Sequence, residues 1–469
     1  MPKILIAAFD GLQPSQATAE LMPVVSRLAE SGVRFLHNHA VFPTVTRCNS
    51  ASLVTGVTPG RHGLTANKLV FPEYSTTEVV DALVPKLPEI NDLTDGNLLL
   101  VPTLGELISK HDLKWVSVVG GTSGNAFVQH PNAEKFGGVV IHPEFTNPPD
   151  HHERITTKFG DWPAKKAPAA DLVVRTADVA IEYAIGELGP DVLLVWFPEP
   201  DTSQHAFGVD SPEAQQMYSL ADGQLGRILT AIEELGDDPD VFVVSDHGYS
   251  TIDAVIDVKE ELTKAGFSVD ENEDSVIVAE NGGSVLLYLP NGNQQLIEKL
   301  LAWLTVQEWV DAVATDHQDS SGAEYASISD LGIDGQRAPD IAVAMRSTDT
   351  GKPAPLSRSG AAAGGRVGVG SHGGSSPAEM HNTLIASGSS FASGLRSDLP
   401  SGNIDVAPTV LELLGIPLPD HFHGRVLGEA LKNADTAAGN GSESTSRDVI
   451  TNGINATIVG TTSYLCSFG

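Results

Sequence analysis

Three short apolar runs, each followed within a few residues by an aspartate, constrain this chain more than any other feature. Continuous apolar runs of this length are typical of parallel strands that are buried on both faces. Helical patterns lie between them, so strand and helix alternate, and this predicts an α/β fold with a mostly parallel sheet between two layers of helices. The runs are Ile4–Phe9 before Asp10, Val192–Phe197 before Asp201, and Val241–Val244 before Asp246.

The chain of 469 residues is too long for one simple core, so a second, smaller unit is expected. We predict a core made of residues 1–250 and 338–432. Residues 251–337 contain short β-like runs and a helical segment, and we interpret them as a smaller α+β insertion that acts as a cap. Residues 433–469 are interpreted as a linker followed by a weakly β-like C-terminal tail.

Side chains that can ligate metal ions follow the predicted strands and gather in a few other short blocks. Ligands of α/β proteins lie beyond the carboxyl ends of parallel strands, where these aspartates are expected. Oxygen and imidazole donors suit Zn²⁺, and Mn²⁺ tolerates the same set. Two such ions about 4 Å apart promote displacement at phosphorus. The candidate ligands are Asp10, Thr46, Asp201, His205, Asp246, His247 and His372.

Each of these blocks also has a simpler interpretation when it is taken alone. Asp10 could be a turn or capping residue, and His372 could be an ordinary loop histidine. Asp201 and His205 are four residues apart, which allows them to reach one ion from a short helix. Adjacent Asp246 and His247 at a strand end cannot both point into an apolar core. The metal hypothesis therefore depends on the blocks meeting in space.

Thr46 is the candidate nucleophile, because coordination to a divalent ion lowers the pKa of a hydroxyl group. Thr44 is a competing hydroxyl, whereas Cys48 has no adjacent base and is not expected to attack. Asn49 lies one helical turn after Thr46 and could donate to a phosphoryl oxygen in the transition state. Two further residues are candidates for contact with the substrate, Arg47 and Asn67.

The charge and composition limit the kind of partner. The net charge of −32 comes from 60 acidic and 28 basic residues, which argues against nucleic-acid polymers and anionic membranes. A small phosphorylated substrate remains possible, since two divalent ions reverse the local field. With two cysteines, no signal-peptide pattern and no apolar run of about 18 residues, we expect a cytoplasmic protein that does not bind a membrane. Monomer and homodimer both remain open.

Taken together, the blocks resemble the alkaline phosphatase superfamily and, within it, the type I phosphodiesterase/nucleotide pyrophosphatase family. In order, they are IAAFDGL, FPTVTRCNS, EPDTSQHAFG, SDHG and SHGG. The resemblance runs from residue 4 to about residue 430 and implies an alkaline phosphatase-like fold for the core.

The resemblance also implies roles for individual residues. One zinc ion would be held by Asp201, His205 and His372. The other would be held by Asp10, Thr46, Asp246 and His247. Thr46 would form a covalent phospho-threonine that a metal-bound hydroxide then hydrolyses, and Asn49 would stabilise the transition state.

The sequence departs from the family at one point that bears on the substrate. Relatives often have Phe-Pro directly after the nucleophile, whereas this chain has Arg47-Cys48, so no aromatic side chain for stacking on a nucleobase is evident. Hydrolysis of a phosphodiester or pyrophosphate is therefore the leading expectation. The alternatives are hydrolysis of a C–P bond, as in phosphonoacetate hydrolase, a phosphomonoesterase or phosphomutase on the same scaffold, and a non-catalytic protein that binds metal or phosphate.

Overall fold

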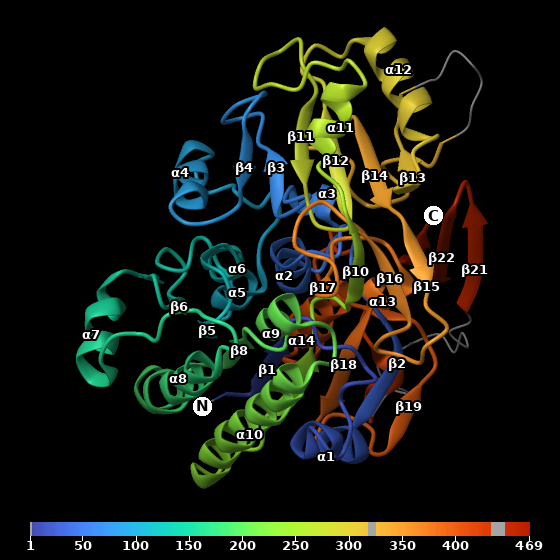
Figure 1. The fold of residues 1–469 in the computed structure, drawn as a ribbon. Helices are drawn as coiled ribbons and strands as arrows, with labels where there is room; N and C mark the ends of the chain where they lie inside the picture. The colour runs from blue at the N-terminus through green and yellow to red at the C-terminus, as the bar shows by residue number, and fades with distance from the viewer. Residues whose placement is uncertain (1, 318–324, 433–445) are drawn as a thin grey trace.

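A ten-stranded sheet forms the centre of the computed structural model, which describes residues 2–317, 325–432 and 446–469 (Figure 1). Its strands follow the order β19-β2-β18-β9-β1-β8-β5-β6-β7, and β20 pairs with β2. Strands β9, β1, β8, β5 and β6 are parallel, whereas β18 and β7 run antiparallel to their neighbours. The strands are β1 (Ile4–Phe9), β2 (Val33–His39), β5 (Trp115–Val119), β6 (Val139–His142), β7 (Phe145–Asn147), β8 (Val192–Phe197), β9 (Asp240–Val244), β18 (His381–Ser387), β19 (Leu395–Ser397) and β20 (Ser401–Gly402).

Two helical layers cover this sheet, as the alternating pattern predicts. Strand β1 divides its side chains between them: Leu5, Ala7 and Phe9 pack in one layer, and the intervening residues pack in the other. The first layer contains α1 (Pro23–Ser31), α7 (Asp150–Phe159), α8 (Ala170–Val179), the π-helix η1 (Ala180–Leu188) and α10 (Pro212–Glu234). The second layer contains α2 (Thr46–Thr55), α5 (Leu104–Ser109), α6 (Ser123–Gln129) and α14 (Val406–Leu413). The α/β fold with a mostly parallel sheet is confirmed.

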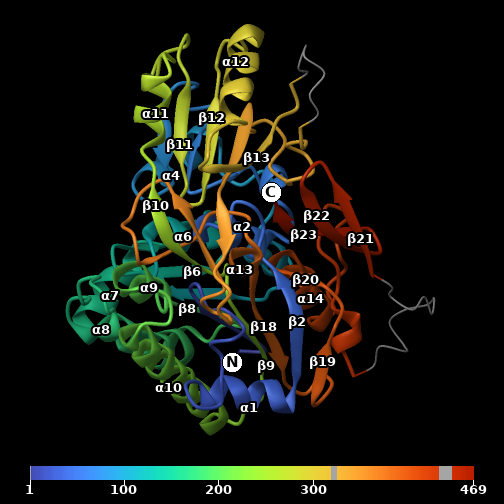
Figure 2. The ribbon, with the colours of Figure 1, turned by 45° about the vertical axis from the view of Figure 1, so that its right-hand side comes forward.

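The insertion forms a second sheet at the end of the molecule opposite to α1 and α10 (Figures 1 and 2). Its order is β11-β12-β14-β13, with two helices packed against one face. The elements are α11 (Val258–Lys264), β11 (Ile277–Glu280), β12 (Ser284–Tyr288), α12 (Gln294–Leu304), β13 (Val310–Ala314) and β14 (Ile341–Met345). The predicted α+β character is therefore correct for this segment.

The predicted boundary at residue 338 is wrong. Strand β14 lies between β12 and β13, so the insertion continues to at least Met345. Its residues are buried on both faces: Ala342 and Ala344 pack in one apolar cluster, and the other three pack in another. This gives the continuous apolar run that is typical of a core parallel strand. A small four-stranded sheet then leads back to the core, with β10 (Ser250–Val255), β15 (Ser347–Asp349), β16 (Arg358–Ala362) and β17 (Gly370–Ser371).

The C-terminal tail is more ordered than predicted. Strands β21 (Ser446–Thr451), β22 (Ile454–Val459) and β23 (Thr462–Phe468) form an antiparallel sheet that packs beside the core (Figure 2). The predicted linker lies almost entirely outside the described residues. Within the residues that the structure describes, no helix is both long and apolar enough to cross a membrane.

Candidate active site

Three adjacent parallel strands bring the three aspartates together. Strand β1 pairs with β8 on one side and with β9 on the other, so all three carboxyl ends lie at one edge of the sheet. Asp10 follows β1 directly, and the backbone N–H of Asp201 donates to its carbonyl at 3.0 Å. Asp246 follows β9 after one residue. Helix α9 (Asp201–Phe207) begins at Asp201 and carries His205 one turn later.

The first donor group consists of Asp10, Asp246 and His247, whose ligand atoms lie within 4.8 Å of one another. All three side chains are buried. One oxygen of each carboxylate is satisfied, by Trp196 Nε1 at 3.0 Å for Asp10 and by the N–H of Gly11 at 3.0 Å for Asp246. The remaining oxygens, Asp10 Oδ1 and Asp246 Oδ2, are buried without a hydrogen-bond partner among the described residues. Two unsatisfied carboxylate oxygens in one buried place fit a cation.

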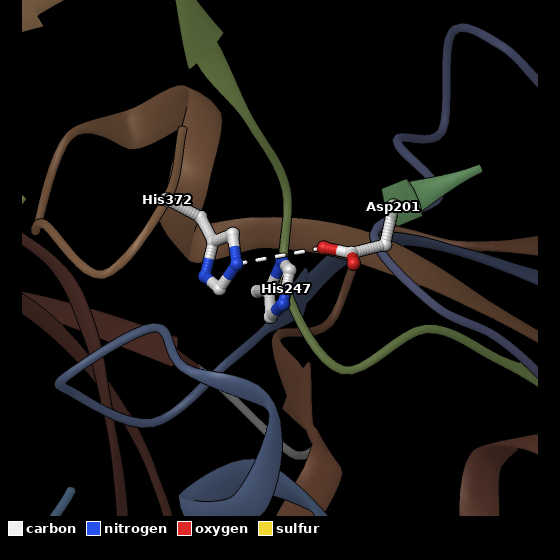
Figure 3. A group of neighbouring side chains, drawn as sticks. All are labelled: Asp201, His247 and His372. Carbon is white, nitrogen blue, oxygen red and sulfur yellow. Dashed lines mark ion pairs between the residues drawn. The ribbon is translucent and has the colours of Figure 1, made fainter. Parts of the chain in front are cut away.

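The second donor group consists of Asp201, His247 and His372, so His247 belongs to both groups. Figure 3 shows these three side chains pointing toward one another from separate segments. Asp201 Oδ1 lies 3.5 Å from Nε2 of His372 and 3.3 Å from Nε2 of His205. The structure thus brings His205 to the same place, as the sequence predicts.

Backbone carbonyls orient the three histidines. Because a carbonyl can only accept, Nδ1 of each ring must be the donor, and in the neutral form of the ring Nε2 then keeps its lone pair for a ligand. Hydrogen bonds of this kind orient imidazoles in metal sites. The pairs are His205 with Gly370 at 3.1 Å, His247 with Gly248 at 3.0 Å and His372 with Thr44 at 2.7 Å.

The electrostatics of the site also fit bound cations. Burial and the neighbouring Asp246 carboxylate raise the pKa of Asp10 well above its usual range, a repulsion that a divalent ion between them would remove. Burial, together with the His247 ring stacked at 3.7 Å, lowers the pKa of His372 to about 4. The imidazole of His372 is therefore neutral near pH 7, and this is the form that binds a metal.

The geometry distinguishes between the two candidate hydroxyls. Thr46 is the first residue of α2, and its Oγ1 lies 3.2 Å from Nε2 of His247. The hydroxyl of Thr44 is already engaged, since it donates to the carbonyl of Gly374 at 2.7 Å and accepts from the N–H of Gly373 at 2.9 Å. Thr46 is therefore the hydroxyl at the donor groups, and Thr44 holds the loop that carries His372.

Asn49 does not point toward a phosphoryl group, and this corrects the expectation from its spacing. Its Nδ2 donates to the carbonyls of Val41, Pro43 and Val45 at 3.2, 3.2 and 3.1 Å. Its Oδ1 accepts from the N–H of Val41 at 2.8 Å and from Asn403 Nδ2 at 3.0 Å. Both ends of the amide are thus occupied, and Asn49 fixes the loop before Thr46.

Asn67 differs from Asn49 in its hydrogen bonding. A cavity of about 390 Å³ beside His205 and His372 is lined by Asn67 and Arg47. Asn67 Oδ1 accepts from the N–H of Arg47 at 2.9 Å, and within the described part of the chain its Nδ2 has no hydrogen-bond partner. The guanidinium of Arg47 is paired with Asp81 and also donates to the carbonyl of Asn67 at 3.2 Å. Asn67 therefore supplies an available donor, whereas the charge of Arg47 is already balanced.

Three residues of the site were missed in the sequence. Tyr249 donates through its hydroxyl to Asp201 Oδ1. Glu379 accepts from Ser250, and burial raises its pKa to about 7. Asn281 of the insertion is paired with the backbone of Lys68. Only Tyr249 had a signal, because it directly follows the block SDHG.

Comparison with protein-family models identifies the family. The model of the type I phosphodiesterase / nucleotide pyrophosphatase family matches residues 4–347. The chain belongs to this family. The match includes six of the seven predicted ligands, and His372 lies beyond its end.

Curated relatives are distant and match part of their length. Ectonucleotide pyrophosphatase/phosphodiesterase family member 7 of Homo sapiens is 24% identical over 255 residues, which cover 54% of this chain and 48% of that protein. An uncharacterized pyrophosphatase/phosphodiesterase of Schizosaccharomyces pombe is 23% identical over 248 residues, covering 52% and 44%. The chain thus spans about half the length of the curated relatives it matches.

Solved structures share the fold over almost the whole chain. Human ectonucleotide pyrophosphatase / phosphodiesterase 5 has a TM-score of 0.64 at 16% identity, covering 92% of this chain and 100% of that chain. An inactive variant of the murine protein, with alanine in place of a threonine and in complex with AMP, has a TM-score of 0.62 at 17% identity, covering 89% and 96%. At this identity the likeness concerns the fold.

Proposed function

We propose that this protein is a two-metal hydrolase of phosphodiester or pyrophosphate bonds that acts through a covalent phospho-threonine on Thr46. The observation that carries the proposal is the convergence of two groups of metal-type donors on the hydroxyl of Thr46. Family membership supports the reaction class. The inactive alanine variant of the murine relative is consistent with a catalytic threonine in that protein.

The donor set suits two Zn²⁺ ions, with Mn²⁺ as the alternative. Asp201, His205 and His372 would hold one ion. Asp10, Thr46, Asp246 and His247 would hold the other. When bound, the ions would supply positive charge that lowers the pKa of the attacking hydroxyl and balances the charge that develops on the leaving oxygen.

The chain's own residues define the chemical step. Thr46 Oγ1 loses its proton to solvent and attacks phosphorus, while the bond from phosphorus to the leaving oxygen breaks and the leaving group departs as an alcohol or a phosphate. The phosphoryl group, with its remaining substituent, is then attached to Thr46, and a water molecule cleaves this ester to regenerate the hydroxyl. The available amide of Asn67 would donate to a phosphoryl oxygen as negative charge develops there.

The cavity beside the donor groups indicates which substituent the substrate carries. None of the described residues that line it is Phe, Tyr or Trp, and its charged side chains are Arg47, Lys68, Asp81 and Glu280. A polar lining of this kind suits a small oxygen-rich substituent better than a nucleobase, because a base gains affinity mainly by stacking. The same lining also suits phosphonoacetate, which keeps C–P hydrolysis as the second candidate.

A substrate panel tests the proposal. The full chain would be reconstituted with Zn²⁺ or Mn²⁺ and assayed with bis-p-nitrophenyl phosphate, p-nitrophenyl phosphate, a p-nitrophenyl nucleotide and phosphonoacetate. We expect turnover of the diester, with the simple diester preferred over the nucleotide. Turnover of phosphonoacetate alone would replace the proposal with C–P hydrolysis, and exclusive monoester turnover would make the protein a phosphatase. The cytoplasmic location stays a prediction, and monomer and homodimer are both still open.

A further inference from the structure

We infer that the hydroxyl of Tyr249 orients the Asp201 carboxylate and thereby sets the affinity of the chain for the ion that Asp201 holds. Tyr249 is a positioning residue in this account, because it acts through a metal ligand. The inference rests on the proposed metal centre, and it goes beyond that centre by assigning a role to a side chain outside the ligand set.

The contacts of Tyr249 place it among the ligands. Its hydroxyl donates to Asp201 Oδ1 and lies 3.2 Å from the carbonyl of the same residue. Its ring meets the rings of His205, His247 and His372 with centroid distances of 5.3, 5.7 and 5.2 Å. The side chain is fully buried. A phenol in this position contacts both proposed ion sites through its ring but hydrogen-bonds to one of them only.

Two glycines make room for the ring. A Cβ atom on Gly11 would lie 2.5 Å from Tyr249 Cε2, and one on Gly370 would lie 2.8 Å from Tyr249 Cδ1. Both distances are far below van der Waals contact. Gly11 directly follows Asp10, and Gly370 lies two residues before His372. The two loops that carry these ligands are therefore built around the tyrosine ring.

The consequence for ion binding follows from the hydrogen bond. Asp201 Oδ1 also faces His205 Nε2 and His372 Nε2, so the phenol bonds to the oxygen that is directed toward the other donors. A fixed donor on that oxygen restricts rotation of the carboxylate and reduces the entropy that is lost when the ion binds. Asp10 and Asp246 receive no such bond from Tyr249 within the described residues, so the effect belongs to one ion of the two.

Replacing the tyrosine by phenylalanine tests the inference, because Tyr249→Phe keeps the ring and removes only the hydroxyl. The full chain would be stripped of metal and titrated with Zn²⁺ against a chromophoric chelator. We expect one of the two ions to bind roughly 10- to 100-fold more weakly and the other to bind as in the wild type. The readout is ion affinity, so it does not depend on finding the natural substrate.

Tyr183→Phe is the matched control. Tyr183 is also buried, and its hydroxyl is hydrogen-bonded to His151 Nδ1 at 2.7 Å in the helical layer away from the donor groups. The Tyr183→Phe variant loses one buried hydrogen bond, as Tyr249→Phe does. Its affinities for both ions should nevertheless equal those of the wild type. Unchanged affinities in Tyr249→Phe, or equal weakening of both ions, would overturn the inference. A wild-type chain that binds no ion would overturn the metal centre together with it.

Discussion

At the scale of single residues, the site separates groups that react from groups that hold them. Thr44, Thr46, Asn49 and Asn67 are all polar and lie close together in the sequence, yet their hydrogen bonds give them different roles. Thr44 and Asn49 are fully engaged with the backbone. In the proposed mechanism, Thr46 and Asn67 keep a hydroxyl and an amide for the substrate. Spacing alone suggested Asn49 because it lies one turn after Thr46, and it could not reveal that Asn49 turns back to its own loop.

Alanine substitutions of Asn67 and Asn49 should therefore have different effects. Asn67→Ala removes a donor to the developing charge and should lower kcat by about 10²- to 10³-fold, with the fold intact. Asn49→Ala leaves buried carbonyls unsatisfied and should lower the free energy of unfolding by at least about 1–3 kcal/mol. Steady-state kinetics and chemical denaturation distinguish them. If Asn49→Ala is stable but has the catalytic defect, and Asn67→Ala is fully active, then Asn49 is the transition-state donor, as its spacing from Thr46 suggested.

At the scale of elements, the buried carboxyl of Glu379 gives α13 (Pro377–Met380) a pH-dependent role. Burial raises its pKa from 4.5 to about 7. Between these values the folded state keeps a proton that the unfolded state has lost, so the free energy of unfolding falls as pH rises. This destabilisation by Glu379 is absent below about pH 4.5 and reaches its full size above about pH 7.

Glu379→Gln should remove that pH dependence. We expect the stability of the variant relative to the wild type to rise by on the order of 3 kcal/mol between pH 4 and pH 8, measured by denaturation of the metal-free protein. The metal-free form is required because cations near His247 would lower the pKa of Glu379. The exposed Glu234→Gln serves as control, and a difference that does not change with pH would contradict the assignment.

The insertion is tied to the catalytic core by a few backbone contacts. Asn281 accepts from the N–H of Lys68 and donates to its carbonyl, both at 2.9 Å. The N–H of Gly283 donates to the carbonyl of His372 at 2.9 Å. Deleting the whole insertion would therefore disturb a ligand loop as well as the cavity, so a point variant is the cleaner test of its role.

Asn281→Ala should release the segment that carries Asn67. We expect kcat to fall by roughly 10-fold, because small misplacement of a positioning group has large kinetic effects. Asn293→Ala is the matched control. Asn293 caps α12 of the same insertion through Leu296, and its loss should cost about 1 kcal/mol without a change in kcat. Equal kcat in the two variants would show that the insertion does not position the site.

Sequence reasoning identified the central elements because each has a strong local pattern. Strands β1 and β8 have the predicted bounds, and the three aspartates follow their strands. The sequence pattern could not distinguish β14 from a strand of the main sheet, because a strand buried on both faces has the same continuous apolar run in either sheet. Hydrophobic spacing also does not reveal the change in hydrogen-bond register from α8 to the π-helix η1. Asn281 and Glu379 belong to no sequence motif, so only their hydrogen bonds in the structure identify them.

At the scale of the whole molecule, the C-terminal sheet supports the loops that form the site. The ring of Phe468 contacts that of Phe42, four residues before Thr46, with centroids 6.1 Å apart. The carbonyl of Phe468 accepts from Ser375, just after His372, at 2.6 Å. Tyr464 donates to the buried Asp405 at 2.8 Å. The C-terminal sheet therefore supports the loop before Thr46 and the loop after His372.

Phe468→Ala should show this support. We expect a loss of about 3–5 kcal/mol in the free energy of unfolding, because the ring is buried. Ile450→Ala on the same sheet is the control, since Ile450 is 77% exposed and should change stability by less than about 0.5 kcal/mol. Denaturant titration measures both variants. Equal free energies of unfolding for the two variants would mean that the C-terminal sheet does not stabilise the core.

The most direct test of the central claim is the turnover of bis-p-nitrophenyl phosphate by wild type and Thr46→Ala at equal, measured ion content. Removing the nucleophile should lower kcat by several orders of magnitude, on the order of 10⁵-fold. The remaining ligands around Thr46 should still hold both ions. Wild-type turnover in Thr46→Ala with both ions bound would contradict the covalent mechanism and with it the assignment of the site.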